Sequence, residues 1–409
     1  MAHDEDVWAR GWTHRFAMQV VTGLLLSAVL VPITSAPGVA RTRTYAPRTP
    51  QAHQPAAPKV GAPAATSYIV INPATGEELT SQNPDRPGFP ASMTKMMTAL
   101  LVMEAVKEGQ LKLSDPVKTS AWASHIGGSR VYLKEGEVFS VEEMMGAMMI
   151  GSANDAATAL AEHLTGSVAA TVQRMNDRAA ALKLTATQFH SVHGLPPGPG
   201  QSPDVTTPRD MARLATELLK YPDILRWTST EEAPFRGGLF ILRNSNHLIG
   251  KFAGADGLKT GYYSQAGFNV TATATKGPLR IVAVVMGAPT NRGRFEEAAR
   301  LLGEGFNRYI GVTVIKGGTV VDTDVKIARA VRAFRPVASQ DIQLMLKREE
   351  KDAFKTSVEI QPNLRAPLAK GQPVGAMVVR IGDKEVGRTP LITAGDVPRT
   401  FFWWLTPWK

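Results

Sequence analysis

The sequence contains no cysteine, so neither disulfide bonds nor thiolate metal sites are available to this 409-residue chain. It also lacks a basic run interleaved with aromatic residues, although the formal net charge is +10. Lysines and arginines are instead spread along the chain, which argues against a nucleic-acid interface, where basic and stacking residues gather. A negatively charged membrane surface or cell-wall polymer suits this scattered positive charge better.

Long apolar runs are scarce, and the clearest one lies near the N-terminus at residues 16–31. Arg10 and Arg15 precede it, which is the pattern of a secretory signal peptide. Small residues at its end suit cleavage, so residues 1–40 are interpreted as a leader, with an uncleaved membrane anchor as the alternative. Residues 41–66 have almost no large apolar side chains and many prolines, which predicts a disordered linker.

The rest of the chain is long enough for one large hydrophobic core and a smaller second one, because 44% of all residues are hydrophobic. Two domains are therefore expected, over residues 67–311 and 312–395. The second domain is predicted to be all-β, because short strand-like segments are separated there by glycine turns. These segments are residues 312–316, 320–327, 341–346, 354–360, 373–380 and 384–390.

Local signals also predict elements of the first domain. Ser140 and Glu143 have the spacing of a capping box for a helix at residues 141–149. Thr207 precedes a proline in the position of a helix cap, which predicts a helix at residues 208–219. The other expected elements are a hairpin at residues 67–80, a helix at 155–164, a strand at 239–244, strands at 267–275 and 279–286, and a helix at 294–306.

Ser92 and Lys95 are the feature around which the rest of the sequence is interpreted. Residues i and i+3 share one face of an α-helix, so a hydroxyl and an amine come together without any tertiary contact. Residues 96–106 are apolar on nearly every side, which predicts a buried helix, and burial lowers the pKa of a lysine as a catalytic base requires. If Ser92 lies in the first turn, the helix N-terminus also favours a forming alkoxide.

This pair alone is weak, because a serine and a lysine three residues apart occur by chance on many surface helices. Two further motifs strengthen it: Ser152 and Asn154 belong to a Ser-Ala-Asn motif, and Lys259 begins a Lys-Thr-Gly motif. The first residues of the three motifs are spaced 60 and 107 positions apart. Such a set is typical of penicillin-binding proteins and class A β-lactamases.

On these motifs the chain resembles the low-molecular-mass penicillin-binding D-alanyl-D-alanine carboxypeptidases, serine peptidases that trim peptidoglycan stem peptides. The resemblance runs from about Ser67 to the C-terminus. It implies an α+β fold: a penicillin-binding/serine β-lactamase-like transpeptidase domain, in which helices flank an antiparallel sheet, followed by a small all-β domain. Stem peptides ending in D-alanyl-D-alanine are the implied substrates and β-lactam antibiotics the implied covalent inhibitors, with no cofactor and no metal.

The resemblance also implies roles for the first two motifs. Ser92 attacks the carbonyl between the two D-alanines, and Lys95 accepts its proton. Ser152 relays a proton to the leaving amine, while Asn154 binds the substrate backbone. Ala153 stands where class A β-lactamases carry Asp, a variation typical of carboxypeptidases.

The third motif is expected to bind the substrate. Lys259 supplies a fixed positive charge, Thr260 supplies a hydroxyl, and Gly261 lets the strand backbone approach the ligand. Backbone N–H groups of Ser92 and Tyr262 would hold the oxyanion. Some relatives have His at the position of Tyr262, so the sequence does not decide how the rim of the cleft is built.

A carboxypeptidase must bind a free carboxylate, for which an arginine side chain is well shaped. By resemblance Arg294 takes this role, and Arg292 is the alternative. His190 and His193 invite a zinc interpretation, but no third ligand follows at a suitable spacing. Because His-Gly-Leu recurs near the cleft in the family, His193 is expected to be structural.

Two other functions compete. A class A β-lactamase needs a deacylating glutamate, and no Glu-x-x-Leu-Asn pattern lies between Asn154 and Lys259. A non-catalytic wall-binding protein would have no chemical need for three intact motifs. The C-terminal residues 396–409 carry Trp and Phe beside basic residues, too few to span a bilayer but suited to its interface. This tail predicts a periplasmic protein attached to the outer face of the cytoplasmic membrane, unless the tail packs on the β domain instead.

Overall fold

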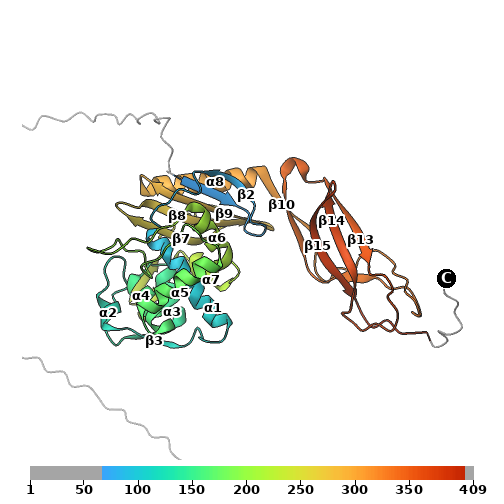
Figure 1. Cartoon of the computed structure of the whole chain (residues 1–409), viewed down its shortest axis with the longest axis horizontal. Coiled ribbons are helices and arrows are strands. Elements are labelled where there is room, and N and C mark those ends of the chain that lie inside the picture. Colours follow the sequence, from blue (N-terminus) through green and yellow to red (C-terminus); the bar gives the residue numbers. More distant parts are fainter. Residues whose placement is uncertain (1–66, 401–409) are drawn as a thin grey trace, which may run out of the picture. The chain divides into compact units, whose positions relative to one another are not determined.

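The computed structural model describes residues 67–400 (Figure 1). The predicted leader at residues 1–40, the linker at 41–66 and the aromatic part of the C-terminal tail lie outside the described residues. Within the described part, no helix is both long enough and apolar enough to cross a membrane.

A five-stranded antiparallel sheet organises the first domain, with strand order β2-β1-β9-β8-β7. Its strands are β1 (Ser67–Ile71), β2 (Glu78–Gln82), β7 (Ala255–Tyr263), β8 (Gly267–Lys276) and β9 (Leu279–Ala288). The N-terminal hairpin joins the meander because β1 pairs with β9, with Val70 opposite Ala283. The hairpin and the two alternating strands predicted from sequence are confirmed. The Lys-Thr-Gly motif lies in the middle of β7, which begins four residues before Lys259.

Alternating side chains of β9 divide the core between the two faces of this sheet. Ala283 and Val285 pack with the helix α8 (Asn291–Arg308), while Val282 and Val284 pack with the other helices (Figure 1). The latter are α1 (Lys95–Lys107), α2 (Ala121–His125), α3 (Val141–Met149), α4 (Asn154–Thr165), α5 (Val168–Ala181), α6 (Pro208–Leu218) and α7 (Asp223–Thr228). They form a helical lobe on that face of the sheet, in which α6 lies against β1 and β9, and α7 lies against β7.

Two predicted helix starts are confirmed in atomic detail. The side chains of Ser140 and Glu143 form the capping box of α3, and the side chain of Thr207 accepts a hydrogen bond from Asp210 N at the start of α6. The helix expected at residues 96–106 is α1, which is buried on almost every side. Ser92 is not in its first turn but in a preceding 3-10 turn, η1 (Ala91–Thr94).

Two short hairpins lie outside the main sheet. One pairs β3 (Pro116–Lys118) with β4 (Val138–Ser140), and the other pairs β5 (Glu232–Phe235) with β6 (Phe240–Arg243) around the turn η2 (Arg236–Gly238). The sequence indicated β6 but not β5, because Glu-Ala-Pro-Phe has little strand propensity of its own. Its conformation depends on pairing with β6.

The C-terminal region is all-β, as predicted, and has a separate hydrophobic core. Strand β10 (Tyr309–Ile315) pairs with β12 (Ile342–Lys347), and a four-stranded sheet has the order β11-β15-β14-β13. Its strands are β11 (Pro336–Ala338), β13 (Phe354–Ile360), β14 (Pro373–Ile381) and β15 (Lys384–Thr393), and a 3-10 turn, η3 (Arg348–Glu350), follows β12.

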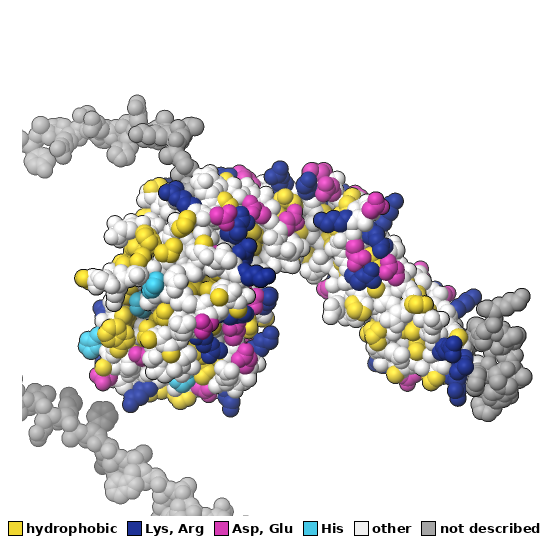
Figure 2. Space-filling model, in the orientation of Figure 1, with side chains coloured by type: hydrophobic (Ala, Val, Ile, Leu, Met, Phe, Trp, Pro, Cys, Tyr) yellow, Lys and Arg dark blue, Asp and Glu magenta, His cyan; other side chains and the backbone are white. Residues whose placement is uncertain are grey.

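The strand predicted at residues 320–327 is wrong. Only isolated bridges occur there, from Val320 to Val337 and from Val325 to Phe334. The apolar side chains of this segment pack into the core without a continuous partner strand, and a strand needs such a partner for its backbone hydrogen bonds. On the face drawn in Figure 2, basic and acidic side chains are interspersed, in agreement with the scattered charges of the sequence.

Candidate active site

The first motif brings a hydroxyl and a buried amine together. Lys95 Nζ lies 2.9 Å from Ser92 Oγ and donates a 2.7 Å hydrogen bond to the backbone oxygen of His193. Burial, and next the positive charge of Lys259, lower the pKa of Lys95 well below its usual range, while Asp204 opposes this shift. A neutral lysine amine can accept the serine proton, so the pair has the geometry of a nucleophile and its base.

The second motif lies across from it, on the turn that begins α4. Ser152 has a φ of +60°, a strained conformation for a residue other than glycine, and its Oγ accepts a 2.9 Å hydrogen bond from Lys259 Nζ. Asn154 Nδ2 donates to the backbone oxygen of Gly127 at 2.7 Å. Asn154 Oδ1 is buried and has no partner in residues 67–400, so it is free to accept an N–H from a ligand.

The third motif supplies a lysine whose charge depends on its surroundings. Burial first, and the charge of Arg294 second, lower the pKa of Lys259 to about 7. An anionic ligand beside this amine would favour its charged form. Thr260 Oγ1 lies 2.7 Å from Ser245 Oγ. The sequence did not identify Ser245 as a partner, because this residue belongs to no recognisable motif.

Gly261 is where strand β7 meets the nucleophile turn. A Cβ atom at this position would lie 2.2 Å from the backbone oxygen of Pro90 and 3.1 Å from Ser92 N, so only glycine permits the contact. The strand backbone thus lies beside the N–H of Ser92, where the oxyanion hole is expected. The ring of Tyr262 is half-exposed and stacks on Phe268, with 4.0 Å between the ring centres.

Of the two candidate arginines, the structure places Arg294 at the third motif. Its Nη1 donates to the backbone oxygens of Gly261 and Asn269, at 3.1 Å each, and burial lowers its pKa to about 10. The Nε atom of Arg294 is buried without a partner among the described residues. Arg292 is 88% exposed and pairs with Glu296 on the surface of α8.

Asp204 holds the loop that contacts Lys95, and the sequence did not identify it. Its Oδ2 accepts hydrogen bonds from Thr94 Oγ1 and Ser191 Oγ at 2.8 Å each, and its Oδ1 accepts from the backbone N–H groups of His190 and Ser191 at 2.6 and 2.9 Å. Burial raises the pKa of Asp204. These bonds hold the loop that carries the backbone oxygen of His193. The prolines and glycines around Asp204 indicated only a surface loop.

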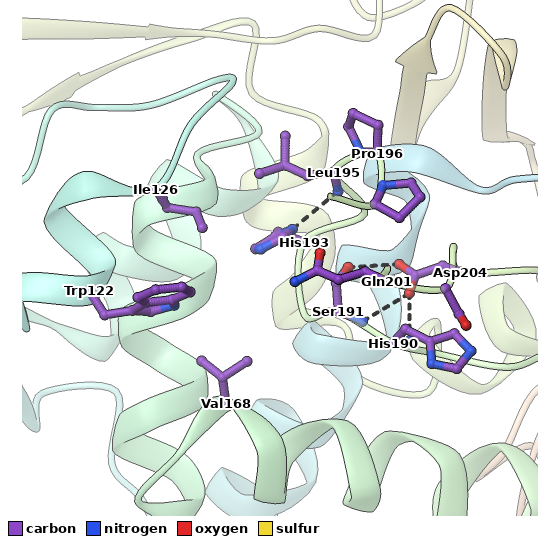
Figure 3. Close-up of a pocket in the computed structure, with 12 residues that line it drawn as sticks. Trp122, Ile126, Val168, His190, Ser191, His193, Leu195, Pro196, Gln201 and Asp204 are labelled. Carbon is purple, nitrogen blue, oxygen red and sulfur yellow. Dashed lines mark hydrogen bonds between the residues drawn. The ribbon is translucent and has the colours of Figure 1, made fainter. Parts of the chain in front are cut away.

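A cavity of about 480 Å³ adjoins this loop (Figure 3). Trp122 and Ile126 lie on one side of it, and His193 with Gln201 on the other. The Nδ1 atom of His193 accepts a 3.1 Å hydrogen bond from Leu195 N, and burial, with the charge of Lys95, lowers the pKa of His193 to about 3. A neutral ring that bonds its own loop fits the structural role expected for His193.

Two regions of the chain match known protein families. Residues 51–290 match the family described as D-alanyl-D-alanine carboxypeptidase, and residues 309–399 match the C-terminal domain of penicillin-binding protein 5. The chain belongs to the D-alanyl-D-alanine carboxypeptidase family. It is therefore a serine-type peptidase of the low-molecular-mass penicillin-binding proteins.

Three relatives illustrate the range of this carboxypeptidase family. D-alanyl-D-alanine carboxypeptidase DacF of Bacillus subtilis is 36% identical over 343 residues, which cover 83% of this chain and 87% of the relative. The structure of penicillin-binding protein 5 from Haemophilus influenzae matches with a TM-score of 0.63 and 31% identity, covering 83% of this chain and 99% of the other. Penicillin-binding protein D2 of Listeria monocytogenes in its ampicillin-bound form has a TM-score of 0.55 and 32% identity, covering 59% and 98%.

Proposed function

We propose that the protein removes the terminal D-alanine from peptidoglycan stem peptides through an acyl-enzyme on Ser92. The observation that carries this proposal is the 2.9 Å separation between Ser92 Oγ and the buried amine of Lys95. Family membership supports the reaction type, and the geometry of the three motifs supports the residue roles.

In the acylation step, neutral Lys95 takes the proton as Ser92 Oγ attacks the carbonyl carbon of the penultimate D-alanine. Backbone N–H groups of Ser92 and Tyr262 stabilise the negative oxygen. The carbon–nitrogen bond then breaks, and Ser152, bonded to Lys259, relays the proton that Lys95 accepted to the nitrogen of the leaving D-alanine. Water next cleaves the ester and restores the free serine.

Asp204 bears on the competing β-lactamase function. A β-lactamase needs a carboxylate that activates water to release the acyl group. The two oxygens of Asp204 already accept hydrogen bonds from Thr94, His190 and Ser191, so this carboxylate has little capacity left to orient a water. We therefore expect β-lactams to stay bound to Ser92 longer than they would on a class A β-lactamase.

Labelling with penicillin tests the proposal. Mass spectrometry of digested protein is expected to show one penicilloyl adduct, on the peptide that contains Ser92, and none in Ser92→Ala. Ser202→Ala is the matched control, since it removes an exposed hydroxyl two residues before Asp204 and should keep the adduct. An adduct that persists in Ser92→Ala would mean that another residue is the nucleophile.

We also propose that the protein is exported to the periplasm and held at the outer face of the cytoplasmic membrane. The leader-like residues 1–40 and the aromatic, basic residues 396–409 support this location. Deleting residues 398–409 is expected to release the protein from membranes and to preserve peptidase activity, because the motifs all lie in residues 92–261. Fractionation of cells with each form measures both; retention of the shortened form would instead implicate an uncleaved N-terminal segment.

A further inference from the structure

The side chain of Arg130 has a buried N–H group, at Nε, that takes no part in the proposed reaction. Among residues 67–400, six residues have a buried side-chain nitrogen or oxygen without a hydrogen-bond partner: Thr119, Arg130, Asn154, Glu162, Arg294 and Ser339. Asn154 and Arg294 are the residues that the proposed function assigns to substrate binding, which would supply their missing partners. A buried, unpartnered N–H is unfavourable, so the Nε of Arg130 calls for a comparable explanation.

Arg130 lies beside the second catalytic motif. The backbone N–H of Asn154 donates to the oxygen of Ser129 at 2.8 Å, directly before Arg130 in the chain. Directly after it, the N–H of Val131 donates to the carboxylate of Asp155 at 3.1 Å. Both neighbours of Arg130 are therefore tied to the start of α4, and Arg130 is held close to Asn154.

The alternation of side chains in this loop turns Arg130 away from the core. Val131 and Leu133 are buried, whereas Tyr132 is 61% exposed. The guanidinium of Arg130 lies 5.1 Å from the centre of the Tyr132 ring, and the backbone oxygen of Tyr132 is held by Arg236 at 3.2 Å. The guanidinium of Arg130 is thus stabilised by an aromatic ring and not by an acidic side chain.

Charge in the cleft favours an anionic ligand. Arg236, on the neighbouring turn, is neutralised by Glu137 at 2.7 Å, but in residues 67–400 no carboxylate pairs with Arg130. Lys259 and Arg294 add further positive charge, and neither forms an ion pair in the described structure. An arginine guanidinium binds carboxylates through paired N–H donors, which matches the unused capacity of Arg130.

We propose that Arg130 binds a carboxylate on the acyl side of the scissile bond, so that the protein prefers peptides with an acidic side chain before D-alanyl-D-alanine. The proposal rests on the carboxypeptidase function. Arg294, bonded to Gly261 of β7, marks the side of the leaving D-alanine, while Asn154 accepts an amide N–H of the acyl portion. The hydrogen bond from Asn154 N to the oxygen of Ser129 keeps the backbone of Arg130 close to Asn154, and for this reason we assign Arg130 to the acyl end.

Two synthetic peptides test this role: N-acetyl-L-glutamyl-D-alanyl-D-alanine and its glutaminyl counterpart, which differ in one charge. We expect the wild type to cleave the acidic peptide with the higher kcat/KM. Arg130→Gln is expected to lower kcat/KM for the acidic peptide about 10- to 100-fold, mainly through KM, and to change the neutral peptide by less than about 2-fold. Arg130→Lys should restore part of the loss. Lys134→Gln, which removes an exposed charge from the same loop, is the matched control and should behave as wild type.

The outcomes distinguish a failure of the Arg130 proposal from a failure of the proposed carboxypeptidase function. An equal loss for both peptides in Arg130→Gln would show that Arg130 only maintains the loop, and equal rates for both peptides in the wild type would show that no acyl-side carboxylate is recognised. Either result overturns the proposal. Cleavage of the neutral peptide by all variants would still support the carboxypeptidase function. Penicillin labelling of Ser92 in each variant reports that the cleft has folded.

Discussion

Replacing Arg294 tests how this protein recognises the end of its substrate. The change is Arg294→Gln, chosen because a shorter amide can still donate one hydrogen bond toward the backbone oxygens of Gly261 and Asn269. What it removes is the positive charge and the Nε donor, which is buried without a partner in the described structure. A free substrate carboxylate is the acceptor that this donor would pair with.

The size of the effect follows from the type of bond lost. A hydrogen bond between charged groups contributes about 1.5–3 kcal/mol. Since about 1.4 kcal/mol corresponds to a tenfold change in rate, kcat/KM for a peptide ending in free D-alanyl-D-alanine should fall about 10- to 150-fold. Weakening the bonds that the guanidinium donates to Gly261 and Asn269 adds a further loss, up to about 1.5–3 kcal/mol for each bond lost, because the donor is charged. That loss applies to any substrate.

The assay therefore compares two peptides that differ only at the C-terminus, one with a free carboxylate and one amidated. The ratio of their kcat/KM values cancels the general loss and isolates the charge pair, because the amidated peptide never formed it. Arg292→Gln is the matched control. Arg292 carries the same charge two residues earlier but is 88% exposed, so its removal should leave the ratio unchanged.

Two results would refute this reasoning. If Arg294→Gln slowed both peptides equally, Arg294 would serve only to hold β7 and β8 together through Gly261 and Asn269. If Arg292→Gln alone lost the preference for the free carboxylate, the recognition site would lie on the surface of α8 and not in the cleft.

Two further predictions concern the buried lysines. Lys95→Ala should lower the rate of penicillin acylation about 10²- to 10⁴-fold, the usual range for a lost general base, as measured by stopped-flow labelling; a near-normal rate in folded protein would place the base elsewhere. The second prediction is a pH dependence. Because Lys259 has a pKa of about 7 in the folded chain against an ordinary 10.5, the unfolded chain binds more protons between these values, and stability should rise with pH across this window. Urea unfolding should show a smaller rise for Lys259→Met, by up to about 1.4 kcal/mol per pH unit, and equal slopes in both proteins would contradict the shift.

Some of this protein could be predicted from neighbouring residues alone. The capping box of Ser140 and Glu143, the Thr207 cap of α6 and the alternating strands β8 and β9 all depend on contacts within a few positions of the chain. The proximity of Ser92 to Lys95 has the same origin, since three residues make almost one turn of a helix. For this reason these interpretations did not need the tertiary structure. The order of the three motifs then identified the family.

The tertiary structure decided every contact between segments far apart in the chain. The Lys259 amine meets Ser152 over 107 residues, and Asp204 reaches Thr94 over 110. No local pattern encodes such distances, because they depend on how β7 packs against η1 and the helical lobe. Packing also decided where the two candidate arginines lie. They are two positions apart on α8, so the helix directs Arg294 inward and Arg292 to solvent. Burial set the pKa shifts of Lys95 and Lys259, since desolvation requires the whole folded core around an amine.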